Sequence, residues 1–128
     1  EQPIRVAVAQ RQLLEKFAQQ GDCVIVGRCA DVILSNNGIP HISLFINAPF
    51  HLRVRRVMDT DGLDKKGATK LLHQLDRRHR HYYNFYTGRR WGDPANYDLC
   101  LNSASYGIDG SVALIRHLIE KSREGAND

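Results

Sequence analysis

"HISLFINAPFHLRVRRVMD", residues 41–59, holds a strand pattern followed at once by a helix pattern. Its first part, "HISLFINA" (41–48), is a nearly continuous apolar run rich in β-branched residues, as expected of a strand that is covered on both faces in a parallel sheet. Pro49 then fits the first turn of a helix that runs to Asp59, where "TDGLD" ends it. A strand followed directly by a helix is the repeating unit of α/β folds.

The same alternation continues on both sides of this stretch. The patterns predict a helix over 4–19 that ends at Gly21, a strand over 23–27 ("CVIVG"), a helix from about Lys65 into the following basic segment, a loop over 88–97, a strand over 97–103 and a closing helix from Asp109 or Ser111. This order predicts a single α/β domain, residues 1–128, in which right-handed crossovers place helices against a parallel sheet.

Length and composition are typical of a small globular domain. A chain of 128 residues can bury one compact core, and its 42% apolar and 25% charged residues are ordinary proportions. No apolar run approaches the roughly 20 residues that span a bilayer, and the N-terminal stretch lacks the pattern of a secretory signal. The three cysteines are odd in number and show no C-x-x-C spacing. We therefore expect a cytoplasmic protein with reduced thiols and no membrane partner.

Arginine is the dominant cation. The chain has 13 Arg against 5 Lys at a net charge of only +4, and eight of the arginines fall between positions 53 and 90. A guanidinium group binds phosphate oxygens in pairs, which a lysine point charge cannot do. The concentration of arginines favours a phosphate-bearing ligand over simple surface solvation.

The densest basic segment is "DRRHRHYYNFYTGRRW" (76–91), with five arginines, two histidines and five aromatic residues. Such a segment could lie along a single-stranded nucleic acid or form a mobile lid over a small phosphate-rich ligand. Asp76 argues for the lid, because a carboxylate facing a phosphate backbone costs affinity, whereas it can hold an arginine such as Arg80, one turn away, in orientation. The tyrosines at 82, 83 and 86 are expected on the buried side of the helix.

Further arginines follow the two predicted N-terminal strands. Arg28 comes directly after the first strand, with Asp31 three residues later. Ligands of open α/β sheets bind at the carboxyl ends of strands, so Arg28 is placed to meet one. After the strand at 41–48, Arg53 and Arg56 are three residues apart and share a helix face from which both could reach a phosphate. The alternative for Arg28 is an arginine that only pairs with a surface acid after a tight turn, and the alternative for Arg53 and Arg56 is a solvated helix face.

Two apparent motifs fail on inspection. "GLDKKGAT" (62–69) has the glycine spacing of a phosphate-binding P-loop, but Ala68 stands where a lysine is required and no strand precedes it. It is interpreted as a turn and a helix start. His73, His79 and His81 lack a carboxylate or cysteine that would complete a metal site, so no metal ligand is assigned.

Three stretches together carry a resemblance to a known family: "AQRQLLEKFAQQGDCVIVGRCADVIL" (9–34), "INAPFHLRVRRV" (46–57) and "LDRRHRHYYNFYTGRRWGDPANYDLCLNS" (75–103). They resemble the cytidylate kinase-like family, a bacterial branch of the P-loop nucleoside monophosphate kinases, over about residues 8–120. The resemblance implies a three-layer, P-loop kinase-like parallel sheet with flanking helices and a helical, arginine-rich lid at about residues 59–96. It also implies a phosphotransferase that moves the γ-phosphoryl group of ATP, with Mg²⁺, onto a nucleotide monophosphate, most simply a CMP-like one.

The resemblance gives roles to the candidate residues. Arg28 matches the family arginine at the acceptor phosphate, and Asp31 lies near, but displaced from, the acid of the "GRD" in true cytidylate kinases. The arginines that begin the lid region are Arg53 and Arg56, and the lid's own acid and arginines are Asp76, Arg77 and Arg78. The family has a further arginine where this chain has His79, so that contact is either lost or taken over by Arg80. A closing lid of this kind neutralises charge on the moving phosphoryl group and excludes water.

The family's first strand and P-loop have no counterpart in these 128 residues. In the family fold that strand lies between those expected at 23–27 and 41–48, so its removal opens a gap in the sheet. Either the chain is a fragment of a longer kinase, which we favour, or the two strands pair directly, or another chain, such as a second copy, fills the gap. We expect little or no turnover by the chain alone. The alternative function is a non-catalytic module that binds a nucleotide or RNA through the arginine-rich site.

Overall fold

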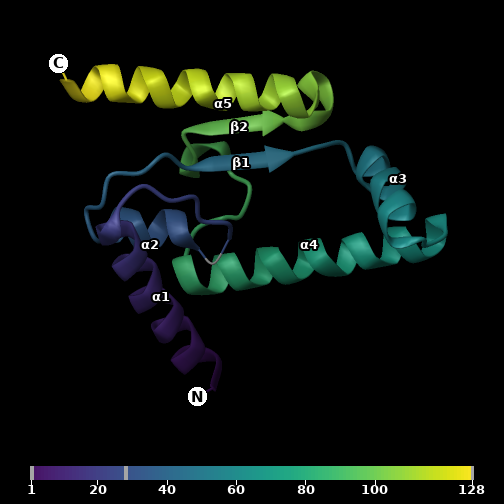
Figure 1. The fold of residues 1–128 in the computed structure, drawn as a ribbon. Helices are drawn as coiled ribbons and strands as arrows, with labels where there is room; N and C mark the ends of the chain where they lie inside the picture. The colour runs from purple at the N-terminus through teal and green to yellow at the C-terminus, as the bar shows by residue number, and fades with distance from the viewer. Residues whose placement is uncertain (1, 28, 128) are drawn as a thin grey trace.

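The computed structural model describes residues 2–27 and 29–127. In these residues the elements are, in order, α1 (Gln2–Gln20), α2 (Ala30–Asn36), β1 (Leu44–Asn47), α3 (Phe50–Asp61), α4 (Lys65–Thr87), the short 3-10 helix η1 (Pro94–Asn96), β2 (Leu99–Asn102) and α5 (Ser103–Asn127). Figure 1 shows the two strands lying between α5 on one side and α2 and α4 on the other. None of the helices in this part of the chain combines the length and apolar character needed to span a bilayer.

The strands β1 and β2 form a parallel pair, with Leu44 opposite Leu99 and Asn47 opposite Asn102. Their starts are tied together just before the sheet begins. The backbone N–H of Ser43 donates to Asp98 Oδ2 over 2.7 Å, and the backbone N–H of Asp98 donates to Ser43 Oγ over 3.1 Å. The predicted parallel α/β sheet is confirmed for these two strands, each of which has four residues.

The predicted strand at 23–27 is wrong. This segment runs without strand pairing from α1 toward α2, and it leaves Val24 93% and Val26 87% exposed. A strand is stable only when its backbone groups pair with a neighbour. β1 is hydrogen-bonded to β2 alone among the described strands, so the apolar pattern of 23–27 finds no neighbour to pair with.

The helices follow the sequence patterns more closely. The expected helix over 4–19 is α1, and Gly62 ends α3 in the left-handed conformation, with φ 67°. Asp64 begins α4 because its Oδ1 accepts a hydrogen bond from the backbone N–H of Gly67 over 2.8 Å, so "GLDKKGAT" is a turn and a helix start as predicted.

The last helix starts earlier than expected. The structure places its first residue at Ser103, where Asn102 Oδ1 accepts a hydrogen bond from the backbone N–H of Ala104 over 3.0 Å. Gly107, with φ 69° and ψ 179°, breaks the helical geometry four residues further on. The starts predicted at Asp109 or Ser111 therefore lie within α5, just after this kink, and not at its beginning.

Two small apolar clusters lie along α4. One contains the buried residues Cys29, Val32 and Tyr83, against which Tyr82, Tyr86 and Trp91 pack. The other contains Val54, Ala68 and Leu72, against which Phe50, Val57 and Met58 pack. The first cluster therefore joins α2 to the C-terminal half of α4, and the second joins α3 to its N-terminal half. The predicted inward position of the three tyrosines is confirmed.

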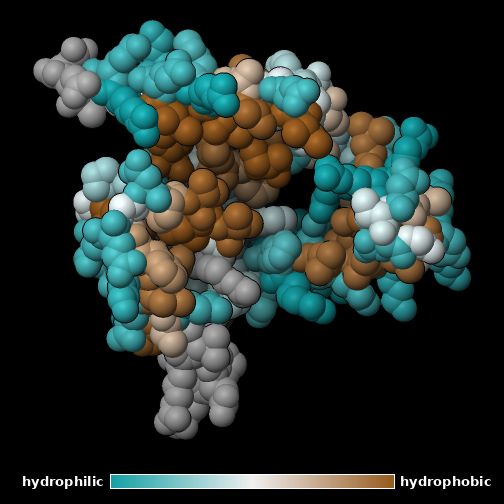
Figure 2. All heavy atoms as spheres, viewed as in Figure 1, coloured by the Kyte–Doolittle hydropathy of each residue, from teal (hydrophilic) through white to brown (hydrophobic). Residues whose placement is uncertain are grey.

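Large apolar side chains also remain at the surface. On α1 they include Leu13 and Phe17, and on α5 they include Ile108, Val112 and Leu114. Figure 2 shows apolar side chains gathered along the side of α5 that faces the strands and continuing over the middle of the molecule. This broad apolar surface lies around β1 and β2, the one pair of strands in the described residues.

Candidate functional site

Arg53 on α3 and Asp76 on α4 form an ion pair through two hydrogen bonds. Arg53 Nη1 donates to Asp76 Oδ2 over 2.9 Å, and Arg53 Nη2 donates to Asp76 Oδ1 over 2.7 Å. The two side chains are 34% and 19% exposed, respectively. The hydrogen bonds from Arg53 hold the pKa of Asp76 below its ordinary value, and those same bonds raise the pKa of Arg53. Paired bonds to a delocalised cation are among the strongest polar contacts in proteins.

This contact fixes what Asp76 does within the arginine-rich segment. A carboxylate that orients an arginine was expected, with Arg80, one turn away, as a partner. The structure instead pairs Asp76 with Arg53, 23 residues earlier in the chain, and both carboxylate oxygens face that guanidinium. Arg56, which was grouped with Arg53, is exposed and forms no ion pair with any described residue.

Two of the three predicted lid arginines lie together. Arg77 and Arg80 line an open groove of about 480 Å³ along α4, with His81, Asn84 and Phe85. The Arg80 guanidinium carbon lies 5.9 Å from the centroid of the Trp91 ring, within the range of a cation–π contact. Arg78 is exposed and does not line this groove. Arg78 thus lies on a different face of α4 from Arg77 and Arg80. This is expected, because consecutive residues of a helix point in different directions.

Asp31 lies in a different set of contacts. Its Oδ2 accepts a hydrogen bond from the Tyr83 hydroxyl over 2.8 Å, which ties α2 to α4. Burial, together with this bond to Asp31, raises the pKa of Tyr83 well above its ordinary value. No hydrogen bond or ion pair among the described residues joins Asp31 to Arg53 or Asp76. Arg28, the arginine expected at the acceptor phosphate, lies outside the described residues.

Sequence reasoning placed Tyr83 in the core but missed its contact with Asp31. The available signal was chemical, because a buried tyrosine hydroxyl needs a hydrogen-bond partner. Asn84 was also missed. Its Oδ1 accepts a hydrogen bond from the backbone N–H of Trp91 over 2.7 Å and thereby holds the loop after α4 against that helix.

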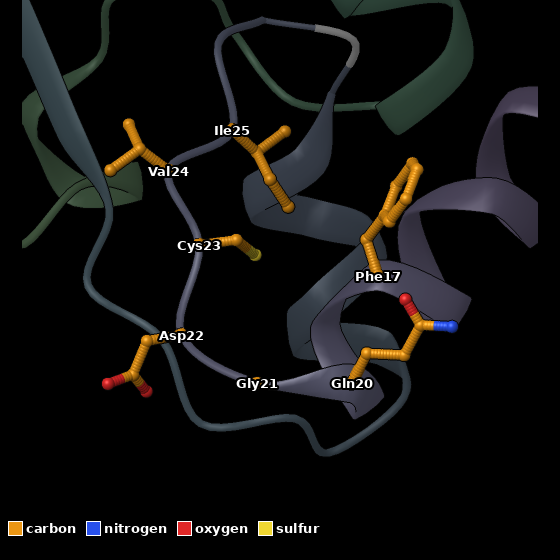
Figure 3. A pocket seen from close by; sticks show the side chains of 7 residues that line it. All are labelled: Phe17, Gln20, Gly21, Asp22, Cys23, Val24 and Ile25. Atoms are coloured by element: carbon orange, nitrogen blue, oxygen red, sulfur yellow. The ribbon is translucent and has the colours of Figure 1, made fainter.

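A second hollow, of about 290 Å³, lies where α1 ends. It is lined by Phe17, Gln20, Gly21, Asp22, Cys23, Val24 and Ile25. Figure 3 shows Cys23 and Ile25 directed toward Phe17, with Val24 and Asp22 on the opposite side of the segment. Asp22 is the one charged residue in this lining and it is acidic, so the hollow is poorly suited to a phosphate.

No group of three or more His, Cys, Asp or Glu side chains lies close enough to hold a metal ion anywhere in residues 2–27 and 29–127. The three histidines considered from the sequence take part in other contacts. His73 stacks on Phe50, His79 lies beside Trp91, and His81 lies nearly parallel to Phe85.

Comparison with known proteins agrees with the motifs. A model of the cytidylate kinase-like family matches residues 2–105. The chain belongs to the cytidylate kinase-like family. The resemblance carried by the three quoted stretches is therefore confirmed. A solved structure of an uncharacterized protein from Eubacterium ventriosum shares this fold, with a TM-score of 0.85 and 34% identity over 91% of this chain and 65% of its own.

Curated relatives of the chain are named cytidylate kinases. The protein from Methanocaldococcus jannaschii is 24% identical over 110 residues, and that from Desulfurococcus amylolyticus is 30% identical over 113 residues. These matches cover 85% and 87% of this chain but 62% and 59% of the relatives. The chain thus spans about three fifths of the length of the curated cytidylate kinases it matches.

Proposed function

We propose that this chain is the acceptor and lid part of a cytoplasmic nucleoside monophosphate kinase that transfers the γ-phosphoryl group of ATP to a CMP-like nucleotide. Residues 59–96 form the lid within a single domain. The arginines proposed to act on the transferred phosphate are Arg77, Arg78 and Arg80. The residues proposed to form the acceptor and phosphate-binding side are Arg28, Asp31, Arg53, Arg56 and Asp76. Membership in the family supports the reaction class, and the groove on α4 supports the position of the lid arginines.

The observation that carries the proposal is the pairing of Asp76 with Arg53. Both oxygens of this carboxylate accept bonds from Arg53, and among the described residues no acid forms an ion pair with Arg77 or Arg80. Their guanidinium groups can then neutralise the charge that spreads over phosphoryl oxygens during transfer. Arg53 has five N–H groups and uses two of them on Asp76, so the remainder can donate to a phosphate.

The family implies that ATP arrives with Mg²⁺, but the described residues do not fit that pair. The sequence contains no P-loop motif, and the described part of the chain holds no cluster of metal-ligating side chains. The proposed role of this chain is therefore to bind and orient the phosphate groups and to exclude water from them. We expect weak or no turnover by the 128 residues alone.

A coupled kinase assay tests the proposal on two proteins: the 128-residue chain, and the same chain joined to the strand, P-loop and helix that the family resemblance implies. We expect phosphoryl transfer to CMP by the extended protein only. Replacing both Arg77 and Arg80 by glutamine should abolish it, while Arg116→Gln and Arg123→Gln together, at exposed positions on α5, serve as a control of equal charge change. Inactivity of the extended, folded protein with every nucleoside monophosphate would rule out the proposed reaction.

A further inference from the structure

The groove on α4 contains more than arginines. Its lining residues Arg77, Arg80, His81, Asn84 and Phe85 follow one another at helical spacing, so they share one face of α4. A volume of about 480 Å³ lies within the range of small-molecule sites. The groove therefore combines two cations, one amide and two rings on a single rigid helix.

The amide of Asn84 is oriented by the backbone. Since Oδ1 accepts the Trp91 N–H at 2.7 Å, the NH₂ group must occupy the other position of the amide. This Nδ2 makes no hydrogen bond with any described residue, although Asn84 lines the groove. Asn84 thus has two unused N–H donors that a ligand could meet.

Phe85 provides a flat apolar surface beside these polar groups. It is 68% exposed, yet its ring is supported by an edge contact with Tyr86 at 4.9 Å and by the nearly parallel ring of His81 at 6.3 Å. An exposed ring next to arginines is the arrangement on which proteins stack nucleobases while holding their phosphates.

We propose that this groove binds a mononucleotide, with its base stacked on Phe85, an acceptor atom of the base at Asn84 Nδ2, and its phosphate at Arg77 and Arg80. The inference rests on the proposed function, in which Arg77 and Arg80 act on the phosphate that is transferred. It adds that these two arginines also hold the phosphate of the nucleotide that receives it, and that the same helix face recognises the base. One nucleotide is the fitting occupant, because the groove presents two cations and one exposed ring on a single face of α4.

Fluorescence of Trp91, the chain's single tryptophan, gives a direct measure of binding because the Arg80 guanidinium lies over its ring. The 128-residue chain is titrated with CMP, with ribose 5-phosphate, which lacks a base, and with a short oligocytidylate at two salt concentrations. We expect CMP to bind about tenfold more tightly than ribose 5-phosphate, which is the size of one base–aromatic stack.

Two variants test the contacts to the base separately from the contacts to the phosphate. Phe85→Ala should remove the advantage of CMP and leave ribose 5-phosphate binding unchanged. Asn84→Asp keeps an acceptor for the Trp91 N–H but loses the donor, and it should weaken CMP more than ribose 5-phosphate. Tyr106→Ala, at a 58% exposed aromatic on α5, is the matched control and should bind like the parent chain. Circular dichroism confirms that each variant is folded.

The outcomes distinguish the inference from the function on which it rests. Equal affinities for CMP and ribose 5-phosphate, or an unchanged CMP advantage in Phe85→Ala, would overturn base recognition while leaving the phosphate site in place. Binding of neither compound would contradict both proposals. Binding of the oligocytidylate alone, with a steep salt dependence, would overturn the mononucleotide assignment in favour of a single-stranded nucleic acid.

Discussion

Arg53 on α3 and Asp76 on α4 are joined by two parallel hydrogen bonds of 2.9 and 2.7 Å across 23 residues of chain. They lie beside the apolar contact of Val54 with Ala68 and Leu72, so charge and packing fix the same helix pair. This arrangement orients the two helices that carry most of the arginines between positions 53 and 90. The pair is consequently the natural place to test how the lid-like region is held together.

We predict a measurable coupling energy between Arg53 and Asp76. In a double-mutant cycle of Arg53→Ala and Asp76→Ala, urea unfolding should give a coupling of about 1 kcal/mol, because the bonds are paired but the arginine remains partly exposed. Arg55→Ala, at an exposed position on α3, should change the free energy of unfolding by less than about 0.5 kcal/mol. A coupling near zero would show that the contact is not maintained in solution.

The pair of Arg53 and Asp76 also predicts that the chain becomes less stable at acidic pH. Arg53 lowers the folded-state pKa of Asp76 below its ordinary value of 3.8, so folding favours the ionised carboxylate. This stabilisation is complete above the unfolded-state pKa and is lost as the pH falls through the lower folded-state pKa. The difference in unfolding free energy between the parent chain and Asp76→Asn should be constant from about pH 5 to 7 and shrink below about pH 4. A difference that stays constant down to about pH 2 would contradict the pairing.

Tyr83 and Asp31 should stabilise the packing of α2 on α4. Tyr83→Phe leaves the ring in the core but removes the 2.8 Å bond to Asp31, and it should cost about 1 kcal/mol. Because the pKa of Tyr83 is raised, its contribution is present below the ordinary value of 10 and is lost at higher pH. Urea unfolding at about pH 7 and pH 10.5 measures both effects. Tyr86→Phe, in the same cluster, is the control, and an equal cost there would show that the bond to Asp31 is not responsible.

Local signals in the sequence were sufficient for α1, α3 and α4 and for two strands. Asp64 and Gly62 mark the start of α4 and the end of α3 through their own backbone and side-chain chemistry. The apolar runs at 41–48 and 97–103 each contain a strand because each finds the other as a parallel neighbour. For these two strands, both the apolar pattern and the neighbouring strand that it needs lie in the same chain.

Pairings between distant elements could not be predicted in the same way. The run at 23–27 has an equally good strand pattern, but pairing depends on a neighbour that its own residues do not encode. Asp76 was expected to act on an arginine, yet helical spacing offered only Arg80, and the position of Arg53 followed from how α3 packs on α4. The sequence therefore predicted that Asp76 orients an arginine, and the structure changes that arginine from Arg80 to Arg53.

The exposed segment should tolerate polar substitution. Val24 and Val26 together changed to threonine should alter the free energy of unfolding by less than about 0.5 kcal/mol, because both side chains lie almost entirely in solvent. The same variant should show less light scattering on concentration, since it removes exposed apolar surface. Val54→Thr, which buries a hydroxyl in the α3–α4 cluster, should cost about 2 kcal/mol. A loss above about 1 kcal/mol in the double variant would mean that the segment is packed.

Thiol labelling should report the same exposure independently. Cys23 is exposed in the segment after α1, whereas Cys29 is buried, and burial followed by the nearby Asp31 carboxylate raises the pKa of Cys29 to about 11. At about pH 8 only roughly one Cys29 thiol in a thousand is ionised, and the thiolate is the reactive form. Iodoacetamide should therefore modify Cys23 at least about a hundredfold faster than Cys29, as measured by peptide mass spectrometry. Cys23→Ser should remove the fast phase, and urea should make Cys29 reactive; rapid labelling of folded Cys29 would contradict its burial between α2 and α4.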